Sequence, residues 1–383
     1  MLSGMAPVRI LHCHSTFTLG GKEARSVRLM NLFGDSAEHA VLSAMPGRLA
    51  ARDAIERGVK VEFPADAPSL TGAPEPLRLH RLARYMRLFD LVLTYNWGAF
   101  DAVMARRLFG GPALVHHEDG FNEDEADRLN SKRNLYRRIG LKAAHRLVVP
   151  SERLERIALR EWGQPRERVE RIANGIPIER YRSAPAAEIA GLVRAEGEIV
   201  VGTVAGLRTV KNLPRLVRAV AAMAAKNARL VIVGEGPESE RIAAEARARH
   251  VADRLVMPGF LADPARWIGA FDIFALSSDS EQFPISLLEA MAAGLPAVST
   301  DVGDVAAMLS DDNRPLVVAR DDEAAFAAGL DSLAARPDLR RALGRANREK
   351  AAAEYDEKRM VERYARLYGE AIGRPDAFSQ PRT

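Results

Sequence analysis

The sequence predicts an α/β protein built from two tandem doubly wound domains that face each other across a cleft. Three observations support this. Short apolar runs that suit strands alternate with helical patterns along almost the whole chain. The alternation is interrupted by Ser183–Gly197, a small, polar and Ala-rich segment that we interpret as a linker, and then restarts. The 383 residues, of which 47% are hydrophobic, suffice for two cores. Such alternation is typical of parallel sheets covered by helices on both faces.

The first half contains a series of strand candidates separated by segments with helical spacing, such as Lys22–Phe33 and Asn134–Ala144. One helical segment, Leu77–Phe89, carries an arginine at every third position. It fits a basic amphipathic helix at a membrane or a covering helix with a solvated face, and we favour the covering helix. The strand candidates are Val8–His14, Ala40–Ala44, Val59–Phe63, Leu91–Asn96, Ala113–His116, Leu147–Pro150 and Val169–Ala173.

The second half repeats the pattern, and Asp321–Gly373 reads as almost wholly helical. We place the domain boundary after Arg182, so that residues 1–182 form the first domain and the second begins at residue 183. The strand candidates here are Ile199–Ala205, Leu230–Val233, Leu255–Met257, Ile273–Leu276, Ala297–Ser299 and Leu316–Val318.

Cysteine content and hydropathy indicate a cytoplasmic protein. Cys13 is the single cysteine and lies in an apolar run, so a disulfide framework is excluded and a buried strand thiol is expected. No run of 18 apolar residues suggests a membrane span. Met1–Pro7 lacks the charged start and apolar stretch of a signal peptide.

The net charge of +4 is unevenly distributed. Residues 1–182 hold 29 Lys+Arg and 22 Asp+Glu, whereas the remainder holds 26 and 29. A basic first half favours an anionic membrane surface or an acidic acceptor as a partner. Nucleic acid is not expected, because aromatic residues are few and the arginines are spread through helices.

Glu281 and Glu289 lie eight positions apart around the start of an apolar helix. Pro284 suits the first helical position, where no amide hydrogen is needed. The helix is expected to run to about Ala293, with Gly294 placed to end it. Glu281 then lies on the loop before the helix and Glu289 inside it.

The start of this helix predicts a phosphate site. The backbone amides of Phe283, Ile285 and Ser286 lie at the positive end of the helix dipole, which suits an anion. The segment thus offers two carboxylates for sugar hydroxyls and a cradle for a diphosphate.

Loops after other predicted strands carry weaker signals. Gly20-Gly21 allows close approach of a phosphate, but taken alone a plain flexible turn is the better interpretation. Arg208 and Lys211 follow a strand and fit either a diphosphate clamp or solvated loop charge. Gly234 begins a tight strand-to-helix turn.

His116 and His117 end a strand candidate and are followed by Asp119. A metal site is not expected, because no convincing second ligand cluster accompanies them. A polar site facing the cleft is the better interpretation. The acids that follow are interpreted as a solvated helix start: Glu123, Asp124, Glu125 and Asp127.

Taken together, these residues resemble the retaining glycosyltransferases of the GT-B fold, glycosyltransferase family 4. The pair Glu281 and Glu289 matches the family's two glutamates separated by seven residues. The resemblance covers about residues 140–372, and the first half matches more loosely. The other matching stretches are Asn174-Gly175-Ile176-Pro177, Lys211-Asn212, Val233 to Pro237, Pro258-Gly259-Phe260, Asp272-Ile273-Phe274 and Glu281 to Val298.

The resemblance implies two Rossmann-like domains, of which residues 183–359 bind the donor, and a C-terminal helix at about 360–383 that returns to the first, acceptor-side domain. It implies that Glu289 binds the ribose hydroxyls. Glu281, with backbone amides near the helix start, would hold the donor sugar and distal phosphate. It also implies that Lys211 clamps the diphosphate and that Val256 and Met257 contact the base through their backbone. His116, His117 or Asp119 would contact the sugar. Further donor contacts are implied at Gly20, Gly21, Gly234, Phe283, Pro284 and Ile285.

Retention in this family is generally understood to need no protein nucleophile, since the leaving phosphate accepts the acceptor's proton on the same face. The protein would stabilise charge and position two sugars. No metal or other cofactor is then expected, because Lys211 and the helix dipole neutralise the leaving group.

The chain departs from the family pattern at three places. Gly206 stands where relatives have arginine, and Arg208 is the candidate replacement. Asp119, not a histidine, precedes Gly120. In the later Gly-Gly turn Asp304 stands for the second glycine, and Ala307 for the acid that follows.

The resemblance therefore implies a cytoplasmic enzyme, peripheral to the membrane, that moves a sugar from a nucleoside-diphosphate sugar to an envelope glycan or lipid-linked acceptor with retention. Two alternatives stay open. One is a nucleotide-sugar epimerase of similar fold, and the other is a non-catalytic nucleotide-sugar-binding protein.

Overall fold

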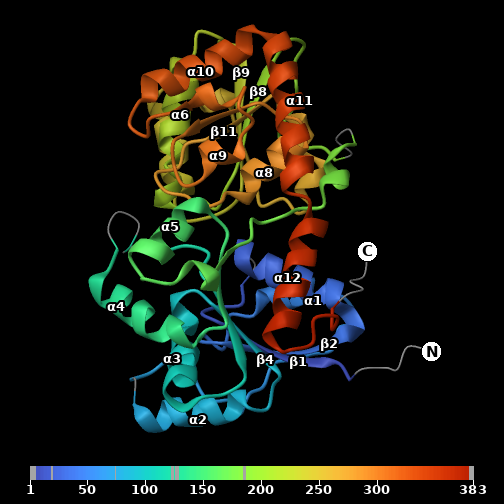
Figure 1. The fold of residues 1–383 in the computed structure, drawn as a ribbon. Coiled ribbons are helices and arrows are strands. Elements are labelled where there is room, and N and C mark those ends of the chain that lie inside the picture. The colour runs from blue at the N-terminus through green and yellow to red at the C-terminus, as the bar shows by residue number, and fades with distance from the viewer. Residues whose placement is uncertain are drawn as a thin grey trace, which may run out of the picture. The chain divides into compact units, whose positions relative to one another are not determined.

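The computed structural model describes residues 6–18, 20–73, 75–121, 125, 129–183 and 187–378. The chain forms two compact units (Figure 1). Unit 1 comprises Met1–Asn174 and Lys358–Thr383, and unit 2 comprises Gly175–Glu357. The predicted boundary after Arg182 thus differs from the observed division.

Unit 1 contains a seven-stranded sheet with the order β3-β2-β1-β4-β5-β6-β7. Every neighbouring pair in it is parallel. The strands are β1 Val8–His14, β2 Ala37–Ser43, β3 Val61–Glu62, β4 Leu91–Tyr95, β5 Ala113–His117, β6 Arg146–Val149 and β7 Val169–Arg171. The helices are α1 Gly21–Phe33, α2 Pro76–Met86, α3 Phe100–Phe109, α4 Ser131–Gly140, α5 Glu152–Arg160 and α12 Glu357–Ala371.

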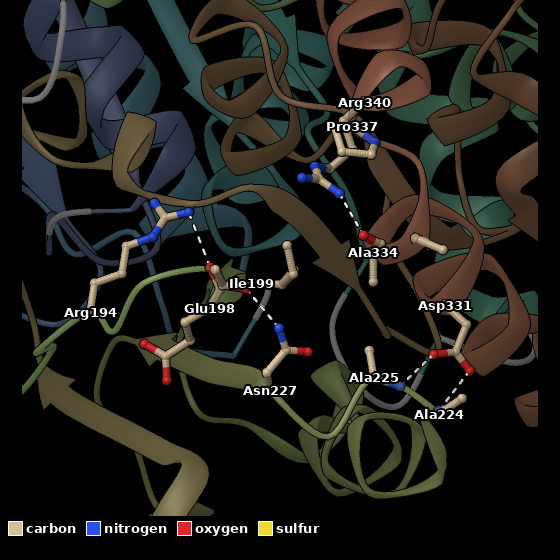
Figure 2. A pocket seen from close by; sticks show the side chains of 12 residues that line it. Arg194, Glu198, Ile199, Ala224, Ala225, Asn227, Asp331, Ala334, Pro337 and Arg340 are labelled. Atoms are coloured by element: carbon tan, nitrogen blue, oxygen red, sulfur yellow. Dashed lines mark hydrogen bonds between the residues drawn. The ribbon is translucent and has the colours of Figure 1, made fainter.

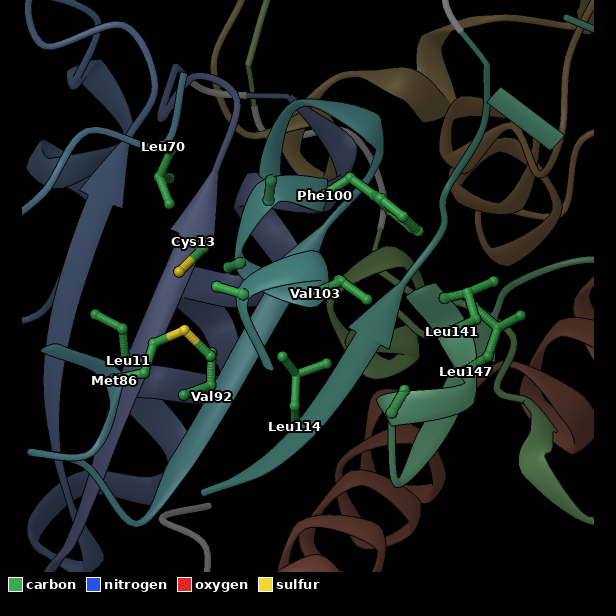
Figure 3. Close-up of a cluster of buried hydrophobic side chains, with 14 of the residues drawn as sticks. Leu11, Cys13, Leu70, Met86, Val92, Phe100, Val103, Leu114, Leu141 and Leu147 are labelled. Carbon is green, nitrogen blue, oxygen red and sulfur yellow. The ribbon is translucent and has the colours of Figure 1, made fainter. Parts of the chain in front are cut away.

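Successive strand residues point to opposite faces of this sheet, and both sets are apolar. Helices therefore cover both faces. Leu11 and Cys13 of β1 pack with α2 and α3 on one face (Figure 3). Val8 and Ile10 pack with α1 and α12 on the other. Cys13 is a buried strand thiol, as predicted. The segment Leu77–Phe89 is a covering helix, since Leu82 and Met86 are fully buried.

The C-terminal helix α12 is part of the core of unit 1. Met360, Tyr364 and Tyr368 are buried against Leu29 and Phe33 of α1. This confirms the prediction that the C-terminal helix returns to the first domain.

Unit 2 contains a six-stranded parallel sheet with the order β10-β9-β8-β11-β12-β13. One core cluster joins its strands to α6, α7 and α10. The strands are β8 Ile199–Val204, β9 Ala228–Val233, β10 Leu255–Gly259, β11 Ile273–Leu276, β12 Ala297–Thr300 and β13 Val317–Val318. The helices are α6 Leu213–Ala222, α7 Ser239–Ala248, α8 Ile285–Ala292, α9 Val305–Met308, α10 Glu323–Ala335 and α11 Pro337–Glu354.

The predicted linker is instead part of unit 2 over its described residues 187–197. Ile189 is 3% exposed, and the Ala187 amide donates to the Arg266 carbonyl. Arg194 binds Asp272 at 2.6 Å. The chain crosses between units after Asn174 and again after Glu357.

Candidate functional site

The sheet of unit 2 has a topological switch point at β8. Its neighbours are β9 on one side and β11 on the other, so the connections from β8 and β11 leave in opposite directions. In open α/β sheets a crevice forms outside the carboxyl ends of the strands at such a point. The loops concerned are 205–212 after β8 and 277–284 after β11, which carry Lys211 and Glu281.

Lys211 and Glu281 lie together at this edge. Lys211 Nζ is 2.5 Å from Glu281 Oε1, and the Ser278 hydroxyl donates to the same oxygen at 2.7 Å. The side chains are 16% and 11% exposed. Thr203, Ser286 and these three residues line a small pocket. One ammonium hydrogen is used by Glu281, so two remain to bind an anion.

A second layer of polar contacts holds the two loops together. The Asn212 amide donates to both carboxylate oxygens of Asp279, at 3.1 and 3.0 Å. The Ser277 hydroxyl donates to the carbonyls of Lys211 and Asn212. Arg215 is 5% exposed and binds Asp279 at 2.8 Å. These contacts fix Lys211 relative to Glu281.

Helix α8 begins beside this pair. Pro284 is the N-cap residue, one position before its predicted place, and the first amide with a backbone partner in the helix is that of Leu287, which donates to the Pro284 carbonyl. The amides of Ile285 and Ser286 therefore point out of the helix start, as the N-terminal geometry requires. The Phe283 ring packs on Tyr355 at 5.6 Å. Gly294, with φ of 78°, ends the helix as predicted.

Glu289 lies inside α8 and is paired with a tyrosine. The Tyr181 hydroxyl donates to Glu289 Oε1 at 3.2 Å. Burial raises the pKa of Glu289 to about 7, against the opposing effect of this hydrogen bond. Burial likewise raises the pKa of Tyr181, so its hydroxyl stays a donor. Glu289 is thus poised between its neutral and charged forms near neutral pH.

The Arg208 side chain lies close to Gly206, the position at which relatives carry an arginine. An added Cβ on Gly206 would lie 3.6 Å from Arg208 Nε. Both residues are exposed. Within the described part of the chain, the Arg208 guanidinium has no hydrogen-bond or ion-pair partner, so it is free to bind a ligand anion.

The loop after β9 is packed tightly against the loop after β8. Gly234 has φ of 140°, and an added Cβ would lie 1.9 Å from the Ala205 carbonyl oxygen. Gly236 has φ of 156°, and its Cβ would lie 2.4 Å from the Leu207 carbonyl oxygen. The Leu207 amide donates to the Glu235 carbonyl at 2.9 Å. These glycines shape the loop that presents Arg208.

Val256 and Met257 lie on the edge strand β10. Val256 is 8% exposed and pairs with Val231, whereas Met257 is partly buried against the core. The ladder is irregular between Val256 and Gly259. The contact of these residues with a base stays a prediction.

In unit 1, Gly20 and Gly21 form the start of α1. Gly20 is the N-cap with extended backbone, and Gly21 is the first helical residue. Lys22 pairs with Glu23, which is 3% exposed and whose pKa is raised by burial. The loop follows β1, whose last residue is His14.

His116 and His117 are both buried, at 0% and 1% exposure. They point to opposite faces of the sheet. His116 Nδ1 lies 2.8 Å from Thr94 Oγ1, and His117 Nε2 lies 2.8 Å from the Tyr368 hydroxyl. Burial lowers the pKa of His117 to about 3, so the ring is neutral at physiological pH. Neither ring is accessible here, and their contact with a sugar stays a prediction.

Asp119 is the most exposed of the three candidate sugar contacts in unit 1, with a side chain 13% exposed. Arg25 binds it in a bidentate manner at 2.5 and 2.9 Å and also donates to Asn174 Oδ1 at 2.8 Å. The Asp119 amide donates to Asn96 Oδ1 at 2.7 Å. Burial opposes ionisation of Asp119, but Arg25 outweighs it and the pKa is lowered.

Glu125 is not part of a solvated helix start. It is 2% exposed and accepts hydrogen bonds from Arg133 at 2.9 Å and Arg137 at 3.1 Å. A pair of arginines at helical spacing on α4 neutralises the buried carboxylate. Glu123, Asp124 and Asp127 lie outside the described residues.

Several residues of these sites were not singled out from the sequence. They are Ser278, Asp279 and Arg215 around the Lys211–Glu281 pair, Tyr181 beside Glu289, and Arg25 beside Asp119. Arg25 had a signal, since an arginine on the buried side of a helix needs a carboxylate partner. Among the residues that the structure describes, no group of three or more His, Cys, Asp or Glu is arranged to hold a metal ion.

A second pocket of unit 2, of about 620 Å³, lies at the opposite, amino end of β8 and β9 (Figure 2). Its polar side chains already have partners in the protein, including Asp272 for Arg194 and Arg229 for Glu198. Asp331 accepts from the amides of Ala224 and Ala225, Asn227 donates to the Gly197 carbonyl, and Arg340 donates to the Ala334 carbonyl. This pocket shares no lining residue with the pocket at Lys211 and Glu281, so the two are separate.

The fold and the placement of polar groups at a switch point define a two-domain α/β protein of the GT-B class. The family model described as Glycosyltransferase Family 4 matches residues 19–180. The model described as Glycosyl transferases group 1 matches residues 186–350. The chain belongs to this family of GT-B glycosyltransferases.

Two curated relatives illustrate the sequence similarity. N-acetyl-alpha-D-glucosaminyl L-malate synthase of Bacillus anthracis is 27% identical over 179 residues, which is 46% of this chain and 47% of that protein. The lipopolysaccharide core biosynthesis glycosyltransferase LpsD of Rhizobium meliloti is 23% identical over 96% of this chain and 100% of its own. The chain spans about half the length of several curated relatives that it matches.

Solved structures share the fold. HepE of Anabaena, crystallised in complex with UDP, has a TM-score of 0.76 at 18% identity, covering 93% of this chain and 98% of its own.

In the described parts of this chain, no helix has both the length and the apolar character needed to cross a membrane.

Proposed function

We propose that the protein is a retaining glycosyltransferase that moves a sugar from a nucleoside-diphosphate sugar to a glycan or lipid-linked acceptor of the cell envelope. The observation that carries this proposal is the Lys211–Glu281 pair at 2.5 Å beside the start of α8, with Glu289 inside the same helix. A cation, outward-pointing amides and two carboxylates match the charges of a nucleotide sugar.

Each group has a role in this proposal. Lys211, Arg208 and the amides at the start of α8 bind the diphosphate. Glu281, held by Lys211 and Ser278, accepts hydrogen bonds from the donor sugar. Glu289 accepts hydrogen bonds from the ribose hydroxyls. Val256 and Met257 contact the base through the backbone, and Gly234 keeps the neighbouring loop in place.

In the proposed reaction the bond between the anomeric carbon and the phosphate oxygen breaks as a bond to the acceptor oxygen forms. The acceptor hydroxyl proton passes to the leaving phosphate, so no protein base is required. The leaving diphosphate gains negative charge, and Lys211 and the helix start stabilise it without reorganisation. Because this charge is supplied by the protein, the proposal includes no metal.

The donor and acceptor classes follow from relatives. HepE holds UDP in its crystal structure, which makes UDP-sugars the first donors to test. LpsD matches along the whole of its length and is described as a lipopolysaccharide core enzyme, which supports an envelope glycan acceptor. Work at the inner face of the membrane is supported by the excess of basic residues before residue 183.

The experiment has two stages. Thermal shift with UDP, GDP and ADP identifies the base, and turnover of the matching nucleotide sugars is then measured with and without truncated envelope glycans, in EDTA. We expect acceptor-dependent transfer with an unchanged anomeric configuration by NMR. Interconversion of the nucleotide sugar without acceptor would indicate the epimerase, and binding without turnover the non-catalytic protein.

The membrane part is tested separately by flotation with anionic liposomes. We expect the protein to float with the liposomes at low salt and to be released at high salt. Absence from the liposome fraction at low salt overturns this part alone.

A further inference from the structure

A basic pocket of about 700 Å³ lies in unit 1, at the amino ends of β5 and β6. Ala113 is the first residue of β5, and His145 directly precedes β6. His117 and Asp119 lie at the other, carboxyl end of β5. The basic pocket is therefore at the opposite edge of the sheet from the candidate sugar contacts. Its lining residues are Arg106, Arg107, Ala113, Leu114, Lys142, Ala143, Ala144, His145, Arg168 and Ala371.

The charged residues that line this pocket are all basic, although Glu370 outside the lining acts electrostatically on His145. Four of its lining residues, Arg106, Arg107, Lys142 and Arg168, are basic, and none of the ten carries a carboxylate. They come from three separate elements of the fold, so the gathering is not the solvated face of one helix. Four like charges repel one another unless an anion lies between them.

The four cations are positioned without being neutralised. Arg106 Nε donates to the Pro112 carbonyl at 2.8 Å, and Arg168 donates to the Lys142 carbonyl at 2.7 Å. Neither of these acceptors carries a charge. Over the described residues none of the four forms an ion pair, whereas Arg25, Arg133 and Arg137 of the same unit are all paired with carboxylates.

His145 also lines this pocket and has one ring nitrogen without a partner in the described part of the chain. His145 Nε2 is buried and has no hydrogen bond within the described residues. This nitrogen has almost no accessible surface, so the basic side chains and not His145 would contact a ligand in the pocket.

We propose that this pocket binds a ligand carrying several phosphate groups. Arginine presents a planar fork that fits phosphate oxygens in a bidentate manner, and lysine adds a point charge. The volume exceeds what a single phosphate would fill. The ligand is either a free polyphosphate-type anion or the phosphate headgroup of an anionic lipid, since both offer the same oxygens.

The test compares two charge-reversed proteins of full length. Arg107→Glu with Lys142→Glu alters two exposed side chains of the pocket. Arg57→Glu with Arg81→Glu is the matched control, because both are exposed arginines of unit 1 outside the pocket. Both variants keep Lys211 and Arg208, so phosphate binding at the donor site is equal in the two. Unligated melting temperatures check that both proteins fold.

Binding of tripolyphosphate is measured by calorimetry, and binding of phosphatidylcholine vesicles with and without phosphatidic acid by flotation. For at least one of these probes, we expect the pocket variant either to lose a binding site or to bind about tenfold more weakly. The control variant should bind like the wild type. An effect on tripolyphosphate alone identifies a soluble anion, and an effect on vesicles alone a lipid headgroup. The proposal is overturned if probe binding is weakened equally in both variants. It is also overturned if the pocket variant binds both probes as tightly as the wild type.

Discussion

Tyr181 donates a hydrogen bond to Glu289 at 3.2 Å, although the two residues lie 108 positions apart in the sequence. The contact ties the segment after Pro177 to the helix that carries the candidate ribose ligand. It also places an uncharged donor, not a cation, beside a carboxylate whose pKa burial has raised to about 7. The charge of Glu289 is thus sensitive to pH in the physiological range.

Nucleotide binding is therefore expected to depend on pH through Glu289. The ionised carboxylate accepts hydrogen bonds from both ribose hydroxyls, so affinity falls as pH drops through about 7. Glu289→Gln should bind more weakly at pH 8 by about tenfold and lose this part of the pH dependence. Calorimetry of UDP binding to both proteins from about pH 5 to 8 measures it. Titration of UDP itself is common to both and cancels in the comparison. A parallel pH dependence in wild type and variant contradicts the role.

The same shift affects stability. Because the folded pKa of this acid is raised, the folded protein holds the proton more tightly, and the contribution of Glu289 to stability declines as pH rises from about 4.5 through 7. Glu289→Gln should remove that decline, which is visible in unfolding curves without ligand.

Glu281→Ala is expected to abolish transfer while nucleotide affinity falls little, because Glu281 is proposed to contact the sugar and not the nucleoside. Lys211→Ala should reduce both transfer and diphosphate affinity, since it removes the cation. Initial rates and UDP affinity of the two variants measure this. Glu281→Gln serves as the conservative control and keeps the hydrogen bond from Ser278. Normal turnover in Glu281→Ala and Lys211→Ala would rule out the site.

Arg208 can be tested as a replacement for the missing arginine. Arg208→Ala should lower turnover by about tenfold or more, from loss of a charge-assisted contact with the diphosphate. Adding Gly206→Arg to that variant should restore activity, because the new Cβ meets only Arg208 Nε, at 3.6 Å, in wild type. Failure of Arg208→Ala to change the rate shows that the arginine is not part of the clamp.

Gly234→Ala is expected to destabilise unit 2 and to impair activity. Its φ of 140° is strained for alanine, which costs about 1–3 kcal/mol, and the Cβ would meet the Ala205 carbonyl at 1.9 Å. Gly206→Ala in the adjacent loop is the matched control and should change stability little. Thermal unfolding by circular dichroism distinguishes the two. Equal melting temperatures would contradict the close packing described.

Arg25→Met is expected to destabilise unit 1 by about 3–5 kcal/mol, because it leaves the carboxylate of Asp119 buried and unpaired. The double variant with Asp119→Asn should be less affected than the sum of the two changes. Since the pKa of Asp119 is lowered in the fold, its stabilising effect is full above its ordinary pKa and is lost as pH falls through the lowered value. Chemical unfolding at neutral and acidic pH measures both effects.

Much of the fold is predictable from the sequence because strand candidates carry a strong local signal. Each predicted strand, from Val8–His14 to Leu316–Val318, overlaps a strand of the structure. The role of Ser183–Gly197 was not predictable from composition, since Ala-rich polar segments suit linkers and surface turns alike. The burial of Ile189 in unit 2 decides between them.

The candidate site was predictable where one segment carried several signals, as around Glu281, and not where it depends on distant partners. Arg25 and Asp119 are 94 positions apart, and Arg215 and Asp279 meet across two loops. No local pattern encodes such pairs. The burial of His116 and His117 was missed for a related reason, because the strand extends to His117 and the rings contact Phe100 of α3 and Tyr368 of α12.

The path of the chain has a consequence for synthesis. Unit 2 is inserted into unit 1, and its two ends meet where the Ile176 amide donates to the Tyr355 carbonyl and the Glu357 amide to the Ile176 carbonyl. Unit 2 is therefore translated in full before the rest of α12 is added. Unit 1, which precedes unit 2 in the chain, lacks Tyr364 and Tyr368 until all of unit 2 has been translated. Unit 1 is started before unit 2 and completed after it. The sheet face that α12 covers therefore stays uncovered until α12 has been made.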